Sequence, residues 1–171
     1  YNERLAQVPR FVHPQPEQTL IIGGGDCGCL TEVLKHPEVR RCTMCEIDPM
    51  VVEVAKRHFP YLVTGLEDPR AKVIFGDGKQ YIEEADGRFD VIILDLSDPV
   101  GPAADLFQKK FHRQVYETLN DDGIMVAQSE SPFYHKETVA QMYRICATYF
   151  PLSGCTPASC RYIRRPSGRL R

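Results

Sequence analysis

The chain has 171 residues, of which 43% are hydrophobic and 26% charged, and its formal net charge is −2. This length suits one domain with a full hydrophobic core, and the composition excludes a disordered chain. The charge argues against nucleic acid as the main partner, no apolar run reaches the roughly 18 residues that a membrane span needs, and the N-terminus does not resemble a signal peptide. We therefore expect a globular cytoplasmic protein that binds neither nucleic acid nor membranes.

Short apolar segments alternate with helical patterns along the chain. Strands are expected at residues 19–22, 41–47, 71–75, 89–94 and 123–128, and helices at 29–35, 49–58, 80–85, 106–119 and 138–150. Apolar strands without strict alternation indicate a sheet covered on both faces. Strands that alternate with helices indicate parallel, right-handed crossovers. The sequence therefore predicts an α/β fold, a Rossmann-like, doubly wound and mostly parallel sheet.

The two ends of the chain differ from this pattern. Residues 1–18 contain three prolines and are interpreted as a lead-in segment, with a short helical turn near Arg4. Residues 151–171 end in eleven residues with five arginines and no acidic residue. Because termini are poorly ordered unless they are tied down, we expect a basic, solvated tail there. The catalytic domain is then expected to span residues 19–150.

Seven cysteines are present, and Cys42 and Cys45 have a C-x-x-C spacing. A metal or redox site would need a second pair or nearby histidines. Because the pair lies in a predicted strand, we interpret both residues as buried hydrophobic side chains. The odd number of cysteines argues against a disulfide scaffold.

Residues 23–28 read Gly-Gly-Gly-Asp-Cys-Gly, a G-x-G-x-x-G motif between a strand and a helix. Gly23 and Gly25 permit a tight turn and close approach of a ligand to the backbone. Such a turn can also exist for packing alone, but its place after a strand favours nucleotide binding. Ligands of these sheets lie beyond the carboxyl ends of the strands.

Acidic residues follow the next strands at the same edge of the sheet. Glu46 lies where an acidic residue commonly accepts hydrogen bonds from ribose hydroxyls. Asp48 is interpreted as a helix N-cap before Pro49. Asp77 is placed to accept from an adenine amino group, and the alternative is a simple turn residue.

Asp26 narrows the choice of ligand. A dinucleotide and S-adenosylmethionine both bring an anionic group to this turn, where a carboxylate would repel it. Decarboxylated S-adenosylmethionine carries a sulfonium and an ammonium group and no carboxylate, so it fits better.

Asp95 and Asp98 follow the most apolar strand and form an acidic pocket with Asp26. Acidic pockets bind metal ions or organic cations. A metal site would need more oxygen ligands or a nearby histidine, so we favour a polyamine and expect no metal. The alternative is that Asp95 and Asp98 cap the turn before Pro99.

Five sequence blocks resemble the spermidine synthase family, in order and with the family's spacing, over about residues 1–150. They read LIIGGGDCG, CEIDPMVVEVAKRHFP, DPRAKVIFGDGKQYI, FDVIILDLSDPVGPAADLF and VAQSESPFYH. The resemblance implies a methyltransferase-type domain preceded by a small N-terminal β domain. It also implies a polyamine aminopropyltransferase, which transfers an aminopropyl group from decarboxylated S-adenosylmethionine to putrescine and releases spermidine and 5′-methylthioadenosine.

The resemblance also implies the roles of individual residues. Asp95 corresponds to the general base for the attacking amine. The substrate-binding positions correspond to Tyr1, Asn2, Asp26, Asp98 and Gln128. The positions that bind the nucleoside co-substrate correspond to Gly23, Gly25, Glu46, Asp77, Gly78, Pro102 and Ala103.

The chain departs from the family pattern at several places. Cys27 stands where the family has glycine, and Asn2 where it has histidine or glutamine. We expect the Cys27 side chain to crowd the ligand or to shift the turn. Relative to the family the chain is truncated, and its match decays after Phe150. Loss of closing strands would expose a sheet edge, and loss of the N-terminal domain would weaken the family's homodimer or tetramer.

Two other functions stay open. One is a putrescine N-methyltransferase that uses intact S-adenosylmethionine. The other is a catalytically impaired chain that only binds nucleoside or polyamine. The amine acceptor itself is not readable from the sequence.

Overall fold

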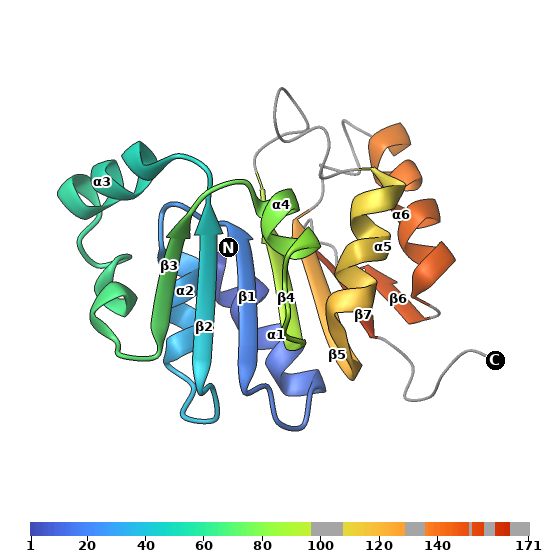
Figure 1. Cartoon of the computed structure of the whole chain (residues 1–171), viewed down its shortest axis with the longest axis horizontal. Helices are drawn as coiled ribbons and strands as arrows, with labels where there is room; N and C mark the ends of the chain where they lie inside the picture. The colour runs from blue at the N-terminus through green and yellow to red at the C-terminus, as the bar shows by residue number, and fades with distance from the viewer. Residues whose placement is uncertain (97–107, 129–135, 151, 156–159, 165–171) are drawn as a thin grey trace.

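A mostly parallel sheet with helices on both faces forms the centre of the molecule (Figure 1). The structure is a computed structural model that describes residues 1–96, 108–128, 136–150, 152–155 and 160–164. The strand order is β3-β2-β1-β4-β5-β7-β6. The parallel strands are β1 (Gln18–Gly23), β2 (Arg41–Glu46), β3 (Ala71–Phe75), β4 (Phe89–Asp95) and β5 (Leu119–Gln128). The predicted α/β fold is confirmed.

Helices cover the two faces of the sheet separately. In Figure 1, α1 and α2 lie behind the sheet and α4, α5 and α6 lie in front of it. The helices are α1 (Asn2–Val12), α2 (Gly28–Leu34), α3 (Pro49–His58), α4 (Gly78–Glu83), α5 (Lys109–Thr118) and α6 (Lys136–Tyr149), and η1 (Thr64–Glu67) is a short 3-10 turn. No helix in the described ranges is long and apolar enough to cross a membrane.

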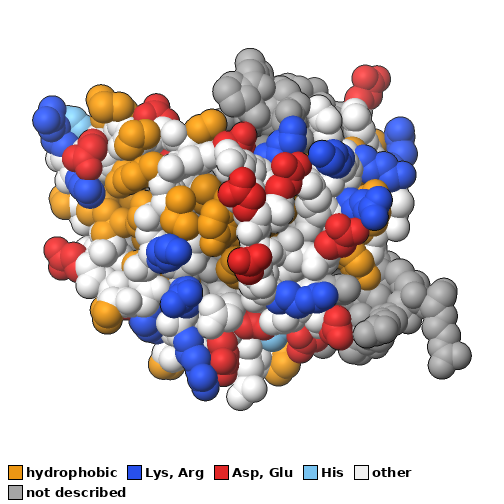
Figure 2. Space-filling model, viewed as in Figure 1, with side chains coloured by type: hydrophobic (Ala, Val, Ile, Leu, Met, Phe, Trp, Pro, Cys, Tyr) orange, Lys and Arg blue, Asp and Glu red, His pale blue; other side chains and the backbone are white. Residues whose placement is uncertain are grey.

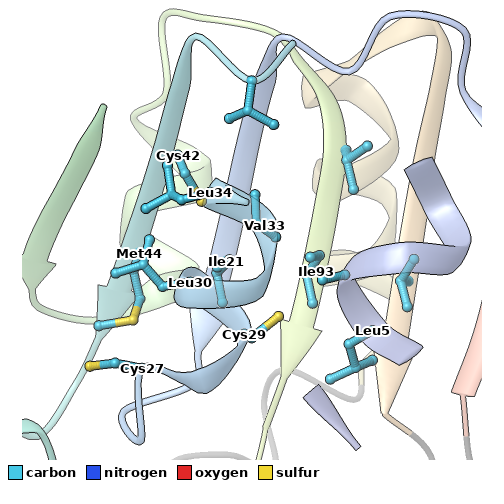
Figure 3. Close-up of a cluster of buried hydrophobic side chains, with 14 of the residues drawn as sticks. Leu5, Ile21, Cys27, Cys29, Leu30, Val33, Leu34, Cys42, Met44 and Ile93 are labelled. Carbon is cyan, nitrogen blue, oxygen red and sulfur yellow. The ribbon is translucent and has the colours of Figure 1, made fainter. Parts of the chain in front are cut away.

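Each face of the sheet has its own apolar core, because successive strand residues point to opposite faces. Ile21 packs with Leu30 and Val33 of α2 in one cluster (Figure 3), whereas Leu20 packs with Phe111 of α5 in the other. Full burial of an aliphatic side chain contributes about 1.5–3 kcal/mol, so these two clusters hold the layers together.

Cys42 and Cys45 belong to opposite cores, Cys42 to the α2 side and Cys45 to the α5 side. Three positions along a strand turn the two side chains to opposite faces, so the pair cannot share a metal ion or form a disulfide. Both are buried and form no disulfide within the described residues, and the same holds for Cys27, Cys29 and Cys146. The interpretation of C-x-x-C as two buried hydrophobic residues is confirmed.

Both ends of the chain contain more regular structure than we expected. The lead-in segment forms the 11-residue helix α1, whose Leu5 is fully buried. Within the expected basic tail, β6 (Leu152–Cys155) and β7 (Cys160–Arg164) pair antiparallel, and β7 also pairs antiparallel with β5. The segment expected to be a basic, solvated tail therefore includes two strands, and β7 covers the edge of β5 that loss of closing strands would have exposed. Strand partners far apart in sequence leave no local pattern that would have predicted this.

Candidate active site

The predicted site lies at the carboxyl ends of β1, β2 and β4, where the strand order reverses direction. β1 pairs with β2 on one side and with β4 on the other, which is the switch point at which such sheets bind ligands. Gly23 is in register with Asp95, and the Gly24 N–H donates to the Asp95 carbonyl at 3.0 Å. The glycine turn and the predicted base are therefore held together by the sheet itself.

The turn after β1 requires glycine because its backbone lies close against two carboxylates. Gly23 and Gly24 have φ of +81° and +73°. A Cβ on Gly24 would lie 3.2 Å from Asp95 Oδ2, and a Cβ on Gly25 would lie 2.9 Å from Glu46 Oε2. The turn thus passes between the carboxylates of Asp95 and Glu46, and side chains there would fill the space beside them.

Cys27 keeps the turn intact by adopting a left-handed conformation. Its φ is 62°, and its Sγ donates to the Gly25 carbonyl at 3.6 Å. The side chain is buried in the same core cluster as Leu30 and Met44 (Figure 3). Burial raises the pKa of the Cys27 thiol to about 11, so it stays protonated at neutral pH. The side chain therefore packs into the protein core, which argues against the expectation that it crowds a ligand.

Among the described carboxyl groups of the site, Asp95 has the most strongly shifted pKa. Burial raises its pKa from 3.8 to about 6, and the neighbouring carboxylates of Asp26 and Glu46 raise it further, while the Tyr1 hydroxyl opposes the rise. A carboxyl group whose pKa lies near neutrality can both accept and return a proton, as general acid–base catalysis requires.

Tyr1 and Gln128 contact each other beside the base. The Tyr1 hydroxyl oxygen lies 2.5 Å from Asp95 Oδ1 and 2.6 Å from Gln128 Oε1. Tyr1 is the N-cap residue of α1, and Gln128 is the last residue of β5. Three elements that are distant in sequence thus place these three predicted site residues together.

Asn2 orients Asp26. The Asp26 carboxylate accepts from the Gly28 N–H at 2.8 Å and from Asn2 Nδ2 at 3.3 Å. A Cβ on Gly28 would lie 1.8 Å from Asn2 Nδ2, so Gly28 leaves the space that the Asn2 amide occupies. The other atom of this amide, Oδ1, is buried without a hydrogen-bond partner in the described ranges. The structure therefore brings Asn2 and Asp26 together, as their predicted shared role requires.

Of the acidic residues at the ends of β2 and β3, Glu46 is buried, whereas Asp48 and Asp77 cap helices. Glu46 is 8% exposed, and its Oε1 accepts from the Asp48 N–H at 3.0 Å. Asp48 accepts from the Met50 N–H and caps α3, which confirms its predicted N-cap role. Asp77 caps α4 through the Lys79 N–H, as in the turn interpretation, so adenine recognition by Asp77 stays a prediction.

Gly78, the other residue predicted beside Asp77, allows α4 to approach the sheet. A Cβ there would lie 2.4 Å from the Ile22 side chain. Asp98, Pro102 and Ala103 lie outside the described residues, so their predicted roles stay predictions.

An apolar surface flanks the site and was not predicted from the sequence. Ile47, Met50, Val51 and Val54 are between 44% and 65% exposed. Figure 2 shows hydrophobic side chains gathered over α3 and the neighbouring end of β3. A Cβ on Gly25 would lie 2.7 Å from Val51 Cγ1, so this surface borders the glycine turn directly. The signal was available, because Met50, Val51 and Val54 recur on one face of the predicted helix 49–58.

Away from this site, the structure brings together three potential metal ligands, His13, Asp90 and Asp122. The sequence analysis did not identify this cluster. Its ligand atoms lie within 4.8 Å of one another. However, His13 Nδ1 accepts from the Gln15 N–H at 3.2 Å, so in the neutral ring the proton is on Nε2. That nitrogen lies 3.4 Å from Asp122 Oδ1 without a hydrogen bond between them, and a protonated ring nitrogen does not suit a metal ligand. We interpret the cluster as a structural polar contact.

A family model and curated relatives match most of this chain. A family model described as the spermine/spermidine synthase domain matches residues 1–163. A polyamine aminopropyltransferase of Desulforudis audaxviator (strain MP104C) is 44% identical over 153 residues, which cover 90% of this chain and 56% of that protein. The homologue of the same name from Caldicellulosiruptor saccharolyticus is also 44% identical, with 55% of that protein covered. The chain spans about half the length of these curated relatives.

Solved structures show the same fold. A spermidine synthase in complex with the transition state analogue AdoDATO superimposes with a TM-score of 0.91 at 36% identity, over 98% of this chain and 61% of that chain. A spermidine synthase from Thermotoga maritima superimposes with a TM-score of 0.88 at 36% identity, over 98% of this chain and 60% of that chain. The match includes α1 and extends into β7, so both end segments have counterparts in the family model.

Proposed function

Since the chain belongs to the spermine/spermidine synthase family, we propose that it is the catalytic domain of a polyamine aminopropyltransferase. It transfers an aminopropyl group from decarboxylated S-adenosylmethionine to putrescine. The observation that carries this proposal is a buried carboxyl group, Asp95, with a pKa of about 6 beside the carboxylates of Asp26 and Glu46. Such a site favours cationic amines and provides a base at neutral pH.

Asp95 removes the proton that would otherwise prevent the amine from attacking. An alkyl ammonium group has a pKa of about 10.4, like lysine, so its nitrogen has no free lone pair at neutral pH. Asp95 accepts one proton from this nitrogen, directly or through water. The lone pair then attacks the aminopropyl carbon, the carbon–sulfur bond breaks, and its electrons return to sulfur, which leaves as the neutral thioether 5′-methylthioadenosine. Orientation of the two substrates for in-line attack supplies much of the remaining acceleration.

The residues around the glycine turn hold the nucleoside in this proposal. Glu46 accepts from the ribose hydroxyls, as acidic residues at this position of the fold do. Val51 and Ile47 provide the apolar flank on which a purine ring can pack. Asp77, with Gly78, Pro102 and Ala103, reads the adenine.

Asp26 separates this function from that of a methyltransferase. Its carboxylate is held in place by the Gly28 N–H and by Asn2. The carboxylate of intact S-adenosylmethionine would approach this fixed negative charge, whereas the decarboxylated form brings none. The same fixed charge, with Asp98 and Gln128, suits the amino groups of a polyamine.

An activity assay tests the proposal. The chain is incubated with decarboxylated S-adenosylmethionine and putrescine, and 5′-methylthioadenosine and spermidine are measured by chromatography. We expect both products, and we expect Asp95→Asn to lower turnover by about 100-fold or more, while Asp86→Asn, an exposed change of the same chemistry, retains it. Near-normal turnover of Asp95→Asn, or consumption of intact S-adenosylmethionine in its place, would contradict the proposal. Binding of the nucleoside without turnover would identify an impaired chain. The predicted cytoplasmic location and the homodimer or tetramer stay predictions.

A further inference from the structure

Three oxygen atoms form a chain from the base to the end of β5. The Tyr1 hydroxyl lies at 2.5 Å from Asp95 Oδ1 and at 2.6 Å from Gln128 Oε1, both within hydrogen-bonding range. A phenol carries one proton and can donate to only one of these oxygens. With the amide oxygen of Gln128 turned towards the phenol, the other contact needs a second proton, and the Asp95 carboxyl is the group that can carry it. Asp95 then donates to Tyr1, and Tyr1 donates to Gln128.

The charges around Asp95 favour the same arrangement. Asp26, in the turn after β1, and Glu46, at the end of β2, both raise the pKa of the Asp95 carboxyl, and burial raises it most. The uncharged carboxyl avoids the cost of burying a third negative charge beside two others. Tyr1, from α1, is the group that stabilises the charged form.

Resting on the proposed function, we propose that at mildly acidic pH the unliganded site holds a proton on the Asp95–Tyr1–Gln128 chain and that a bound ammonium group expels it. Putrescine arrives fully protonated, displaces the carboxyl proton into the buffer and forms an ion pair with the Asp95 carboxylate. Only an O–H bond breaks in this step, and the proton goes to a buffer base. The carboxylate made in this way is the form that later accepts a proton from the attacking nitrogen. Tyr1 and Gln128 thereby act as positioning residues that set the protonation of the base.

Two variants are expected to shift the pKa of Asp95 in opposite directions. In Gln128→Leu the phenol loses its second acceptor and donates to Asp95, which stabilises the carboxylate and lowers the pKa of Asp95. In Tyr1→Phe the carboxylate loses its hydroxyl donor, so the pKa of Asp95 rises. A purely structural role would shift both variants in the same direction or not at all.

Two measurements test the inference. First, a carbon-13 titration of the Asp95 carboxyl in the unliganded protein is expected to show a midpoint near pH 6, lower in Gln128→Leu and higher in Tyr1→Phe. Second, putrescine is titrated calorimetrically in phosphate and in bis-tris, which differ in enthalpy of ionisation. With a pKa of about 6, about half a proton is released at pH 6 and almost none at pH 8. Asp95→Asn is expected to release none at either pH.

The outcomes separate the two proposals. An Asp95 midpoint near pH 4 in the unliganded protein, or binding heats that do not depend on the buffer at pH 6, would overturn the inference and leave the proposed function standing. Putrescine that binds in neither buffer would count against the proposed function, and the carbon-13 titration would still decide whether the proton is held.

Discussion

The hydroxyl oxygen of Tyr1 lies 2.5 Å from Oδ1 of Asp95, although 94 positions separate the two residues in the sequence. The contact depends on α1, whose Leu5 packs in the same core cluster as Ile93 of β4 (Figure 3). Docking of α1 on the sheet therefore places the Tyr1 hydroxyl within hydrogen-bonding distance of the base. The pKa of Asp95, and with it the chemistry of the site, follows from this packing.

Asp95 is expected to lower the stability of the folded chain as the pH rises. Its pKa is 3.8 in an exposed setting and about 6 in the folded protein, so between these values the folded state binds more protons than the unfolded state. The free energy of unfolding then falls as the pH rises from about 4 to 6, because the charge must be buried. In Asp95→Asn this cost is absent. We expect the variant to be more stable above pH 6, by up to about 3 kcal/mol, and the difference to shrink on acidification through this window.

Urea unfolding of both proteins between pH 4 and 8 measures this difference. Asp86→Asn, on the exposed surface, provides the matched control and should follow the parent protein at every pH. A stability difference between Asp95→Asn and the parent that does not change with pH would show that burial of the Asp95 charge is not its cause.

The substitution Gly24→Ala is expected to strain the turn and to displace the Asp95 carboxylate. Its φ is +73°, and the added Cβ would lie 3.2 Å from Asp95 Oδ2. We expect a loss of about 1–2 kcal/mol in stability and a fall in kcat/KM of about 10-fold or more, because the carboxylate must move. Gly87→Ala is the control, since a Cβ there meets nothing within 4 Å. Equal activity of the two variants would argue against contact between the turn and the base.

At Cys27 we expect the glycine variant to be more stable than the alanine variant, the reverse of the usual order in a helix. At φ 62° glycine relieves backbone strain that alanine retains, so Cys27→Gly should be more stable than Cys27→Ala by about 1 kcal/mol. Cys29 lies inside α2 and is equally buried. There the usual helical order applies, and Cys29→Ala should exceed Cys29→Gly by about 1 kcal/mol. The four variants are compared by their unfolding midpoints in urea, and the same order at both positions would refute the left-handed assignment at Cys27.

Arg70 ties the C-terminal end of α2 to the loop before β3. Its guanidinium donates to the backbone carbonyls of His36 at 2.8 Å and Val39 at 3.0 Å and also to the carbonyl of Leu34. A lysine cannot supply this planar set of donors, so Arg70→Lys should lower the free energy of unfolding by about 2 kcal/mol or more. Arg113→Lys, at an exposed pair with Glu117, should change it by less than about 0.5 kcal/mol. Similar small losses for both would mean that the carbonyl contacts contribute little.

Local signals in the sequence were sufficient for the elements that carry the site. Thr19–Ile22 and Phe89–Leu94 are short, mostly apolar runs that predicted buried strands, and they lie within the observed strands β1 and β4. Pro49 and the cap residue Asp48 set the start of α3 at the predicted residue. The glycine turn, Glu46 and Asp95 follow directly, because they are the residues at which these strands end.

Contacts between distant segments required the tertiary structure. The helix α1 and the strand β7 have weak local patterns, and they form because the sheet offers them an apolar face and an open edge. The same is true of the contacts of Tyr1 with Asp95 and Gln128.

The sequence by itself determined which residues stand at the carboxyl edge of the sheet, since periodicity and strand ends are local properties. Only the tertiary structure decided how those residues behave. The proton affinity of Asp95 arises from burial and from the neighbouring charges of Asp26 and Glu46, which packing brings together.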